Sequence, residues 1–237
     1  MIDQHISARY EAELQDLSRR ILEMGRVVEL QVDQAIGSLI NFNGDLAAKV
    51  LVDEQRVNAM EMAIDRDLFG VISKRQPTAR DLRLLIAISK SIGNLERIGD
   101  EASKIARTVQ RLVSAGDPTR LRVPVQDLSH EAQLCIAQLR KTLEAFETQD
   151  AAKALEVLRD DPRIDQAFDG LMRTLITYML EDPRMISSSI DLIFVAKAVE
   201  RIGDHAKNLA EQTIYVVKGE DVRHKPLENI GSAVADS

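Results

Sequence analysis

The amino-acid sequence predicts an all-α protein built as two pseudo-symmetric antiparallel three-helix bundles in tandem. Three observations predict this fold. No stretch has the apolar alternation of a strand, long segments carry apolar residues at helical 4,3 spacing, and one six-residue phrase occurs twice. Leu-Glu-Arg-Ile-Gly-Asp begins at Leu95, and Val-Glu-Arg-Ile-Gly-Asp begins 104 residues later at Val199. Such internal repetition indicates a duplicated structural unit.

The first half contains three predicted helices, which together define a first domain over residues 1–116. Gly44 separates the first two helices, and Pro77 interrupts the chain after the second. Thr78, with an acidic residue three positions later, is expected to cap the third helix, which contains the first phrase. The expected helices are residues 7–42, 45–74 and 78–115.

The second half repeats this plan as a second domain over residues 124–219. The segment from Gly116 to Pro124 is expected to be the linker, and Asp161-Pro162 is a candidate break or kink in the middle helix. Asp182-Pro183 is expected to cap and begin the helix that contains the second phrase. Residues 220–237 show no apolar period and are predicted to be a disordered tail. The expected helices are residues 125–146, 150–180 and 183–218.

Each copy of the phrase places two carboxylates four residues apart on a helix, beside a glycine on the apolar seam. The carboxylates are Glu96 and Asp100 in the first copy and Glu200 and Asp204 in the second. Like charges at this spacing repel, and a bound cation would reverse the effect. The glycine favours close approach of a neighbouring helix, which would bring further ligands. We therefore predict a surface metal site at the edge of each bundle, and oxygen ligands favour Mg, Mn, Ca or iron.

An ordinary solvated helix surface is the alternative interpretation, because most carboxylates at this spacing bind nothing. The available basic partners are Lys104 for Asp100, Lys197 for Glu200 and Lys207 for Asp204. The carboxylate pair recurs in both halves, each time beside a glycine on the apolar seam. This recurrence makes a metal site and an ordinary solvated surface about equally favoured before any resemblance is considered.

Composition excludes several classes of function. The net charge of −7, the absence of tryptophan and an aromatic content of 3% argue against nucleic acid as a partner. Cys135 is the single cysteine, so no intramolecular disulfide forms and the chain suits a reducing cytosol. With neither a signal peptide nor a membrane-spanning run, we expect a cytoplasmic protein that reaches membranes only through partners. Glycine-rich nucleotide loops are also absent.

Four short motifs, in the same order and at matching spacing, resemble those of the PhoU family. Members of this family are accessory regulators of the bacterial phosphate system. The four motifs are Gln76–Arg83, Leu95–Ala102, Glu181–Arg184 and Val199–Glu211. The resemblance covers both halves, from about Tyr10 to Arg223.

This resemblance implies two three-helix bundles, frequent dimerisation, and two Glu/Asp-x-x-x-Asp motifs that bind metal, often as clusters. The motif positions are Glu96 and Asp100, and Glu200 and Asp204. Family members also have acidic residues on the neighbouring helix that could add metal ligands. The corresponding candidates here are Asn58, Glu61, Asp165 and Asp169. Family members restrain the phosphate regulon when phosphate is plentiful. They link the ATPase subunit of the phosphate ABC importer to the sensor histidine kinase of the phosphate two-component system.

Three hypotheses follow. The first is a non-enzymatic, metal-binding regulator of phosphate uptake and signalling, with Mg, Mn or Fe as the ion. The second is a di-metal enzyme on a helical bundle, although such enzymes use Glu-x-x-His rather than the Glu-x-x-x-Asp spacing found here. The third is a purely structural helical scaffold, which predicts no stoichiometric metal. Metal content and metal-dependent turnover discriminate among the three.

Overall fold

A computed structural model describes residues 2–115 and 125–235, and that part of the chain contains helices and no strand. The α-helices are α1 (Ile2–Ile40), α2 (Gly44–Arg75), α3 (Ala79–Ser114), α4 (Val125–Thr148), α5 (Ala151–Glu181), α6 (Ile186–Lys218) and α7 (Leu227–Ala235), with a 3₁₀ turn η2 (Pro183–Met185) before α6. The predicted all-α fold is confirmed, and all six predicted helices are present. The predicted linker, residues 116–124, lies outside the described residues.

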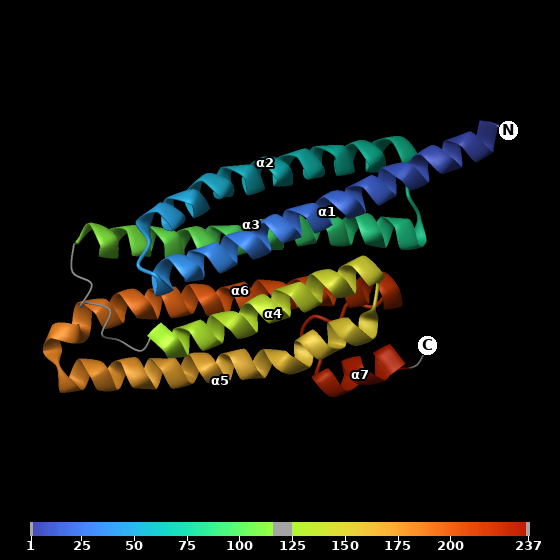
Figure 1. The fold of residues 1–237 in the computed structure, drawn as a ribbon. Coiled ribbons are helices and arrows are strands. Elements are labelled where there is room, and N and C mark those ends of the chain that lie inside the picture. Colours follow the sequence, from blue (N-terminus) through green and yellow to red (C-terminus); the bar gives the residue numbers. More distant parts are fainter. Residues whose placement is uncertain (1, 116–124, 236–237) are drawn as a thin grey trace.

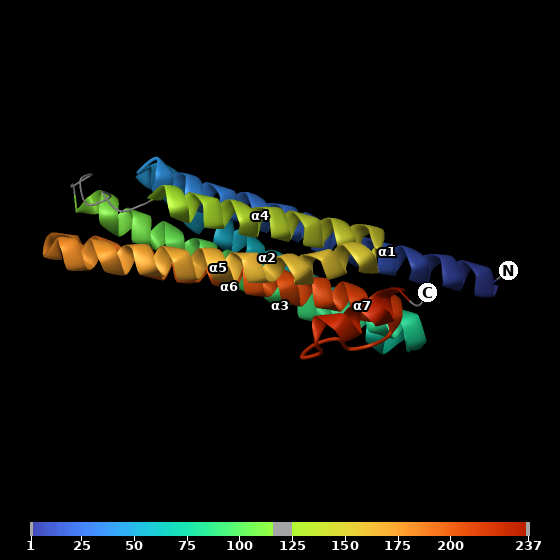
Figure 2. The same ribbon diagram turned by 90° about the horizontal axis from the view of Figure 1, so that it is seen from below.

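The six long helices form two antiparallel three-helix bundles that lie side by side (Figures 1 and 2). Helices α1–α3 make one bundle and α4–α6 the other, as the repeat in the sequence predicts. The principal contact between the bundles is made by α3 and α6, which run antiparallel along each other, and α1 also contacts α4. The two helices that contain the repeated phrase therefore meet at the centre of the molecule.

Side-chain caps fix several helix ends. The carboxylate of Asp150 accepts a hydrogen bond of 2.9 Å from the backbone N–H of Lys153 at the start of α5. Asp182 accepts one of 3.0 Å from the N–H of Arg184, so it caps the 3₁₀ turn that leads into α6. Thr78 precedes α3 in an extended conformation, but its side chain makes no capping hydrogen bond. The expected Thr78 side-chain cap is therefore wrong.

Pro162 does not break α5, which continues from Ala151 to Glu181. A proline removes one backbone hydrogen bond from a helix and crowds the preceding turn. Buried Leu158 and Ile164 on either side of Pro162 pack in the core and hold this part of the helix in place. The predicted break at Asp161-Pro162 is therefore wrong, and the alternative of a kink there stays a prediction.

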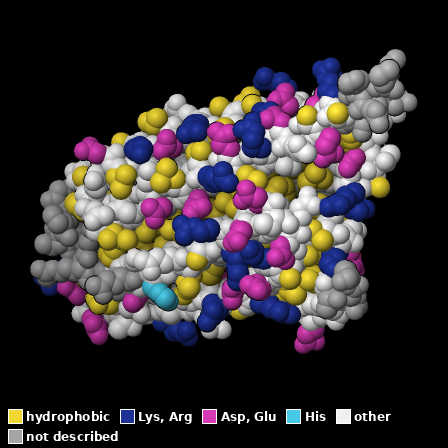
Figure 3. Space-filling view, turned by 45° about the vertical axis from the view of Figure 1, so that its right-hand side comes forward, with side chains coloured by type: hydrophobic (Ala, Val, Ile, Leu, Met, Phe, Trp, Pro, Cys, Tyr) yellow, Lys and Arg dark blue, Asp and Glu magenta, His cyan; other side chains and the backbone are white. Residues whose placement is uncertain are grey.

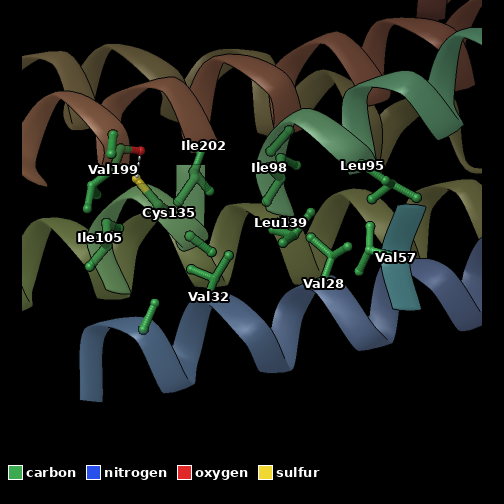
Figure 4. Packing of buried hydrophobic residues seen from close by; sticks show 14 of the residues in the cluster. Val28, Val32, Val57, Leu95, Ile98, Ile105, Cys135, Leu139, Val199 and Ile202 are labelled. Atoms are coloured by element: carbon green, nitrogen blue, oxygen red, sulfur yellow. Dashed lines mark hydrogen bonds between the residues drawn. The ribbon is translucent and has the colours of Figure 1, made fainter. Parts of the chain in front are cut away.

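One continuous cluster of buried apolar side chains extends through both bundles. Figure 4 shows Val28 and Val32 of α1 facing Leu139 of α4, with side chains of α3 and α6 around them. Cys135 of α4 belongs to this cluster, and its Sγ donates a hydrogen bond of 3.4 Å to the carbonyl oxygen of Val199 on α6. The two bundles thus share a core rather than merely touching.

The prediction of a disordered tail over residues 220–237 is wrong for the described residues 220–235. This segment forms α7, and Val222 and Ile230 are only 1% and 2% exposed. Both pack with Leu155 and Leu158 of α5 in a second, smaller apolar cluster. The few apolar residues of this segment pack against α5, which is far away in the sequence. Apolar periodicity within the segment therefore does not predict the helix.

The surface mixes both signs of charge. On the face drawn in Figure 3, acidic and basic side chains alternate without a large area of one sign. None of the described helices has the length and apolar character needed to cross a membrane.

Candidate functional site

In the first copy of the phrase, Gly99 of α3 lies against side chains of both α1 and α2. A Cβ atom on this glycine would lie 3.0 Å from Gln31 Oε1 of α1 and 3.0 Å from Glu54 Oε2 of α2. Any larger residue here would force these two polar side chains to shift by a few tenths of an ångström. The predicted close approach at the seam glycine is therefore confirmed, and it brings a buried carboxylate to the phrase.

Glu54 is held by a small buried hydrogen-bond network. Gln31 Nε2 donates to Glu54 Oε2 at 2.8 Å and to the carbonyl oxygen of Val50 at 3.3 Å. The hydroxyl of Ser103 on α3 donates to the same Glu54 oxygen at 3.0 Å. Gln31 and Ser103 have no exposed surface, and Glu54 is 6% exposed. The carboxylate is thus fixed in orientation by neutral donors.

Three buried oxygens around this network have no hydrogen-bond donor among the described residues. They are Gln31 Oε1, Glu54 Oε1 and Asn58 Oδ1. A buried acceptor without a partner costs free energy, and amide and carboxylate oxygens are ligands that hard cations prefer. The residues present therefore fit a hard metal ion in their chemistry.

Glu96 and Asp100 of α3 belong to the same region, since the Glu54 charge acts on Glu96. The pKa of Glu96 is raised by burial first, and then by the charges of Asp100, Glu61 and Glu54. Burial and Asp65 raise the pKa of Glu61 in the same way. We call Glu54, Glu61, Glu96 and Asp100 the first carboxylate cluster. The neighbouring carboxylates thus disfavour the charged forms of Glu96 and Glu61, which is the condition that a cation relieves.

The second copy of the phrase has the same framework at Gly203. A Cβ there would lie 3.3 Å from Gln138 Oε1 of α4 and 3.4 Å from Ile164 of α5. Gln138 Nε2 donates to Asp161 Oδ1 at 3.3 Å, as Gln31 does to its acidic partner on α2. Asp161 is 5% exposed, and the Nζ of Lys207 lies 2.5 Å from its Oδ2.

Near the second copy of the phrase, Asp204 and Asp165 both have raised pKa values. Although Asp204 reaches solvent, partial desolvation raises its pKa first, followed by the charges of Glu200 and Asp161. The pKa of Asp165 is raised mainly by desolvation and then by Asp161, with a smaller contribution from Asp169. We call Asp161, Asp165, Glu200 and Asp204 the second carboxylate cluster.

Glu131 is a buried carboxyl group beside the second carboxylate cluster that the sequence does not single out. It has no exposed surface, and neither of its oxygens has a hydrogen-bond donor in the described part of the protein. Burial, with a smaller effect of the Glu200 charge, raises its pKa to about 8.

The lysine partners differ from those expected. Lys197 does pair with Glu200 at 2.6 Å. Lys104 pairs instead with Glu101 at 2.7 Å, and the ion pair of Lys207 is with Asp161. The expected ion pairs of Lys104 with Asp100 and of Lys207 with Asp204 are therefore wrong. In each case a neighbouring carboxylate is the more buried group, and it gains more from an ammonium.

His205 lies away from the carboxylates, as its position in the helix predicts. Its Nδ1 is 3.0 Å from Asn94 Oδ1 on α3, and burial lowers its pKa. It belongs to the contact between α3 and α6.

The second carboxylate cluster borders an open cleft of about 880 Å³. Asp161, Asp165 and Asp204 line it together with α3 residues and the segment between α6 and α7. Ions in solution therefore have access to this side of the cluster.

No three His, Cys, Asp or Glu side chains of the described residues converge closely enough to form a ready-made metal-ligand set. Metal binding at the eight predicted residues stays a prediction. Gln31, Gln138 and Glu131 were missed by sequence reasoning. Gln31 and Gln138 are 107 residues apart, the same shift that relates α2 to α5, so the repeat could have identified them.

Comparisons with known proteins agree with the duplicated fold. The family model described as "PhoU domain" matches the chain twice, over residues 21–109 and 128–213. A relative from a Burkholderia species, "Phosphate-specific transport system accessory protein PhoU homolog", is 49% identical over 97% of both chains. The Escherichia coli K12 protein, named without "homolog", is 42% identical over 94% of this chain and 91% of its own length.

Two solved structures have the same architecture. The crystal structure of PhoU from Pseudomonas aeruginosa superposes with a TM-score of 0.85 at 41% identity, covering 89% of this chain and 100% of that one. The phosphate transport system regulatory protein PhoU from Streptococcus pneumoniae gives 0.82 at 26% identity, covering 90% and 99%. With a domain model that matches each half and relatives that align over nearly the full length, the chain belongs to the PhoU family.

Proposed function

We propose that this chain is a non-enzymatic regulator of phosphate uptake and phosphate-regulon signalling that binds metal ions at its carboxylate clusters. Relatives at 42–49% identity are named accessory proteins of the phosphate-specific transport system, and they align over 94–97% of this chain. The bundles carry paired carboxylates and no nucleotide-binding loop, which supports a regulatory rather than an enzymatic role.

The observation that supports a metal most directly is the set of unpartnered buried oxygens beside mutually repelling carboxylates. In the first half Glu96 and Asp100 would hold the ion, with Asn58 and Glu61 beside them. Glu200 and Asp204 would do so in the second half, with Asp165 and Asp169 nearby. A bound Mg, Mn or Fe ion would supply positive charge that neutralises the cluster and orders its side chains.

The partners that we propose follow from the family. They are the ATPase subunit of the phosphate ABC importer and the sensor histidine kinase of the phosphate two-component system. The chain would link the two as a cytoplasmic homodimer at the membrane complexes, and it would repress the regulon when phosphate is plentiful. The names of the relatives support association with the transport system.

The first experiment compares the metal content of the wild-type chain with that of the variant Glu96→Ala/Asp100→Ala/Glu200→Ala/Asp204→Ala, both purified without chelator. We expect stoichiometric metal in the wild type and its loss in the variant. Pull-down of the importer ATPase subunit and of the kinase sensory domain is expected to weaken in parallel.

A matched control removes the same amount of charge from exposed positions outside the clusters. The control is Glu23→Ala/Asp67→Ala/Glu144→Ala/Glu156→Ala. It should keep both metal and partners. Absence of metal from the wild type, or unchanged metal in the cluster variant, would refute the site assignment. Metal-dependent turnover of a phosphate ester or of oxygen would refute the non-enzymatic role.

A further inference from the structure

The two carboxylate clusters are built on one framework, which makes each half a reference for the other. In both, a glutamine from the first helix of the bundle donates to a buried acid of the second helix, and both side chains pack near the phrase. The equivalent pairs are Gln31 and Gln138, Glu54 and Asp161, Gly99 and Gly203. Differences between the halves can therefore be assigned to individual positions.

The clearest difference is the donor to the buried acid. Ser103 hydrogen-bonds to Glu54 in the first half. The residue 104 positions later is Lys207, whose ammonium forms an ion pair of 2.5 Å with Asp161 in the second half. A neutral hydroxyl in one half is thus replaced by a full positive charge in the other.

A second substitution acts in the same direction. Lys197 forms an ion pair of 2.6 Å with Glu200, the first carboxylate of the second phrase. The equivalent position in the first half is Gly93, and no atom lies within 4 Å of where its Cβ would be. Glu96 therefore lacks the intrahelical partner that Glu200 has.

Among the described residues, no basic side chain forms an ion pair with any member of the first carboxylate cluster. Two basic side chains of α3 and α6, Lys104 and Arg201, pair with Glu101 instead, at 2.7 and 3.4 Å. Gln31 Oε1 and Glu54 Oε1 have no hydrogen-bond donor in the described part of the chain, on side chains that are 0% and 6% exposed. In the second half Gln138 Oε1 and Glu200 Oε2 also lack a hydrogen-bond donor there, but the Glu200 carboxylate has the Lys197 ammonium at 2.6 Å. Within the described structure the first cluster thus has no ion-paired carboxylate, although the Arg97 charge acts on Glu61 and Glu96. In the second cluster, two of the four carboxylates are ion-paired.

We propose that the two clusters are not equivalent: the first is the high-affinity site for a hard divalent cation, and Lys197 and Lys207 act as tethered cations that weaken metal binding at the second. This rests on the metal-binding part of the proposed function. An ion entering the second cluster must displace an ammonium from Asp161 or Glu200. Both lysine side chains are more than a third exposed, 44% and 37%, so displacement into solvent is feasible. Binding is weakened and not abolished.

The test is a Mn²⁺ titration of the full chain after chelator treatment, followed by the electron paramagnetic resonance signal of free Mn²⁺. We expect two classes of site that differ about tenfold in affinity, because the Coulomb attraction of a unit charge at contact distance is large near a protein surface and solvent screening of these partly exposed lysines reduces it. Glu96→Gln/Asp100→Asn should remove the tight class, and Glu200→Gln/Asp204→Asn should leave it. Loss of the tight class from the second variant would overturn the proposal.

Exchanging the distinguishing residues tests the cause. Lys207→Ser gives the second half the residue found in the first, and it should tighten the weak class about tenfold. Gly93→Lys places a lysine where the second half has one, at a position with free space, and it should weaken the tight class. Lys153→Ser, which removes an ion-paired lysine outside both clusters, is the matched control and should change neither class.

Each failure has a distinct meaning. Equal affinities at the two clusters, unchanged by Lys207→Ser, would overturn the inequivalence and leave the proposed metal binding intact. No Mn²⁺ bound by the wild type or by any variant would overturn both. Circular dichroism of every variant establishes that it is folded before its affinity is compared.

Discussion

Glu131 shows how strongly one buried carboxyl group can differ from its surface counterparts. It is fully buried on α4, neither oxygen has a donor in the described structure, and burial raises its pKa to about 8. By the 107-residue shift that relates Gln31 to Gln138, its counterpart in the first half is Met24, which is also fully buried. One half thus places a thioether where the other places an acid.

We predict that Glu131 makes stability fall as pH rises from about 5 to 8. Its folded pKa lies above the ordinary value of 4.5, so the folded state holds a proton that the unfolded state loses in this window. The stabilisation is complete below the unfolded pKa and is lost as pH rises through the folded one. The slope is at most about 1.4 kcal/mol per pH unit.

Glu131→Met, the residue of the first half, should remove this contribution. Urea unfolding of the metal-free wild type and variant between pH 5 and pH 9 measures it. The stability difference in favour of the variant should grow with pH up to about 8 and then level off. A difference that is independent of pH would contradict the prediction.

At the scale of the element, α3 contains two glycines with opposite surroundings. No atom lies within 4 Å of a Cβ built on Gly93, whereas one built on Gly99 would lie 3.0 Å from both Gln31 Oε1 and Glu54 Oε2. A glycine inside a helix is less stable than alanine by about 1 kcal/mol. The two positions therefore separate helix propensity from packing.

Gly93→Ala should stabilise the protein by up to about 1 kcal/mol through propensity alone. Gly99→Ala should destabilise it by about 1–3 kcal/mol, because the methyl group must displace a buried hydrogen-bonded pair. Urea midpoints of both variants at one pH provide the comparison. If Gly99→Ala were as stabilising as Gly93→Ala, the close approach would not constrain this position.

The helices were predictable because the apolar spacing persists over several turns in each of them. The same reasoning failed for α7, whose buried Ile230 packs in a cluster formed by residues of α4, α5 and α6 that are distant in the sequence. The site was predictable in part. The duplicated phrase located four carboxylates and the close approach at Gly99. It could not identify Gln31 and Glu54 as the approaching side chains, because that depends on how α1 and α2 pack against α3. The expected pairing of Lys104 with Asp100 failed for a related reason, since spacing along one helix does not show how deeply Glu101 is buried.

At the scale of the whole molecule, the shared core couples the two bundles. Leu95 and Ile98 of α3 belong to the same buried cluster as Leu139 of α4 and Ile202 of α6 (Figure 4). Ion pairs also join the halves, including Arg140 with Glu29 at 2.6 Å. We therefore expect the two units recognised in the sequence to fold and unfold together.

We predict a single cooperative unfolding transition for the intact chain. Calorimetric and van't Hoff enthalpies should agree, as they do for two-state unfolding. Leu139→Ala, a cavity-forming change in α4 at a residue with no exposed surface, should lower stability by about 2–5 kcal/mol and shift the whole transition. Two resolved transitions, of which the variant moves only one, would contradict this.

The position of Cys135 has a practical consequence for spectroscopy. Its thiol is the only one in the chain, has no exposed surface, and burial raises its pKa well above the usual range. The thiolate is the form that attacks thiol reagents, so we expect the native protein to behave towards them as if it had no cysteine. A cysteine introduced at any exposed position can then carry a single fluorophore or spin label. Because the chain also lacks tryptophan, one introduced indole would report on one chosen helix without background.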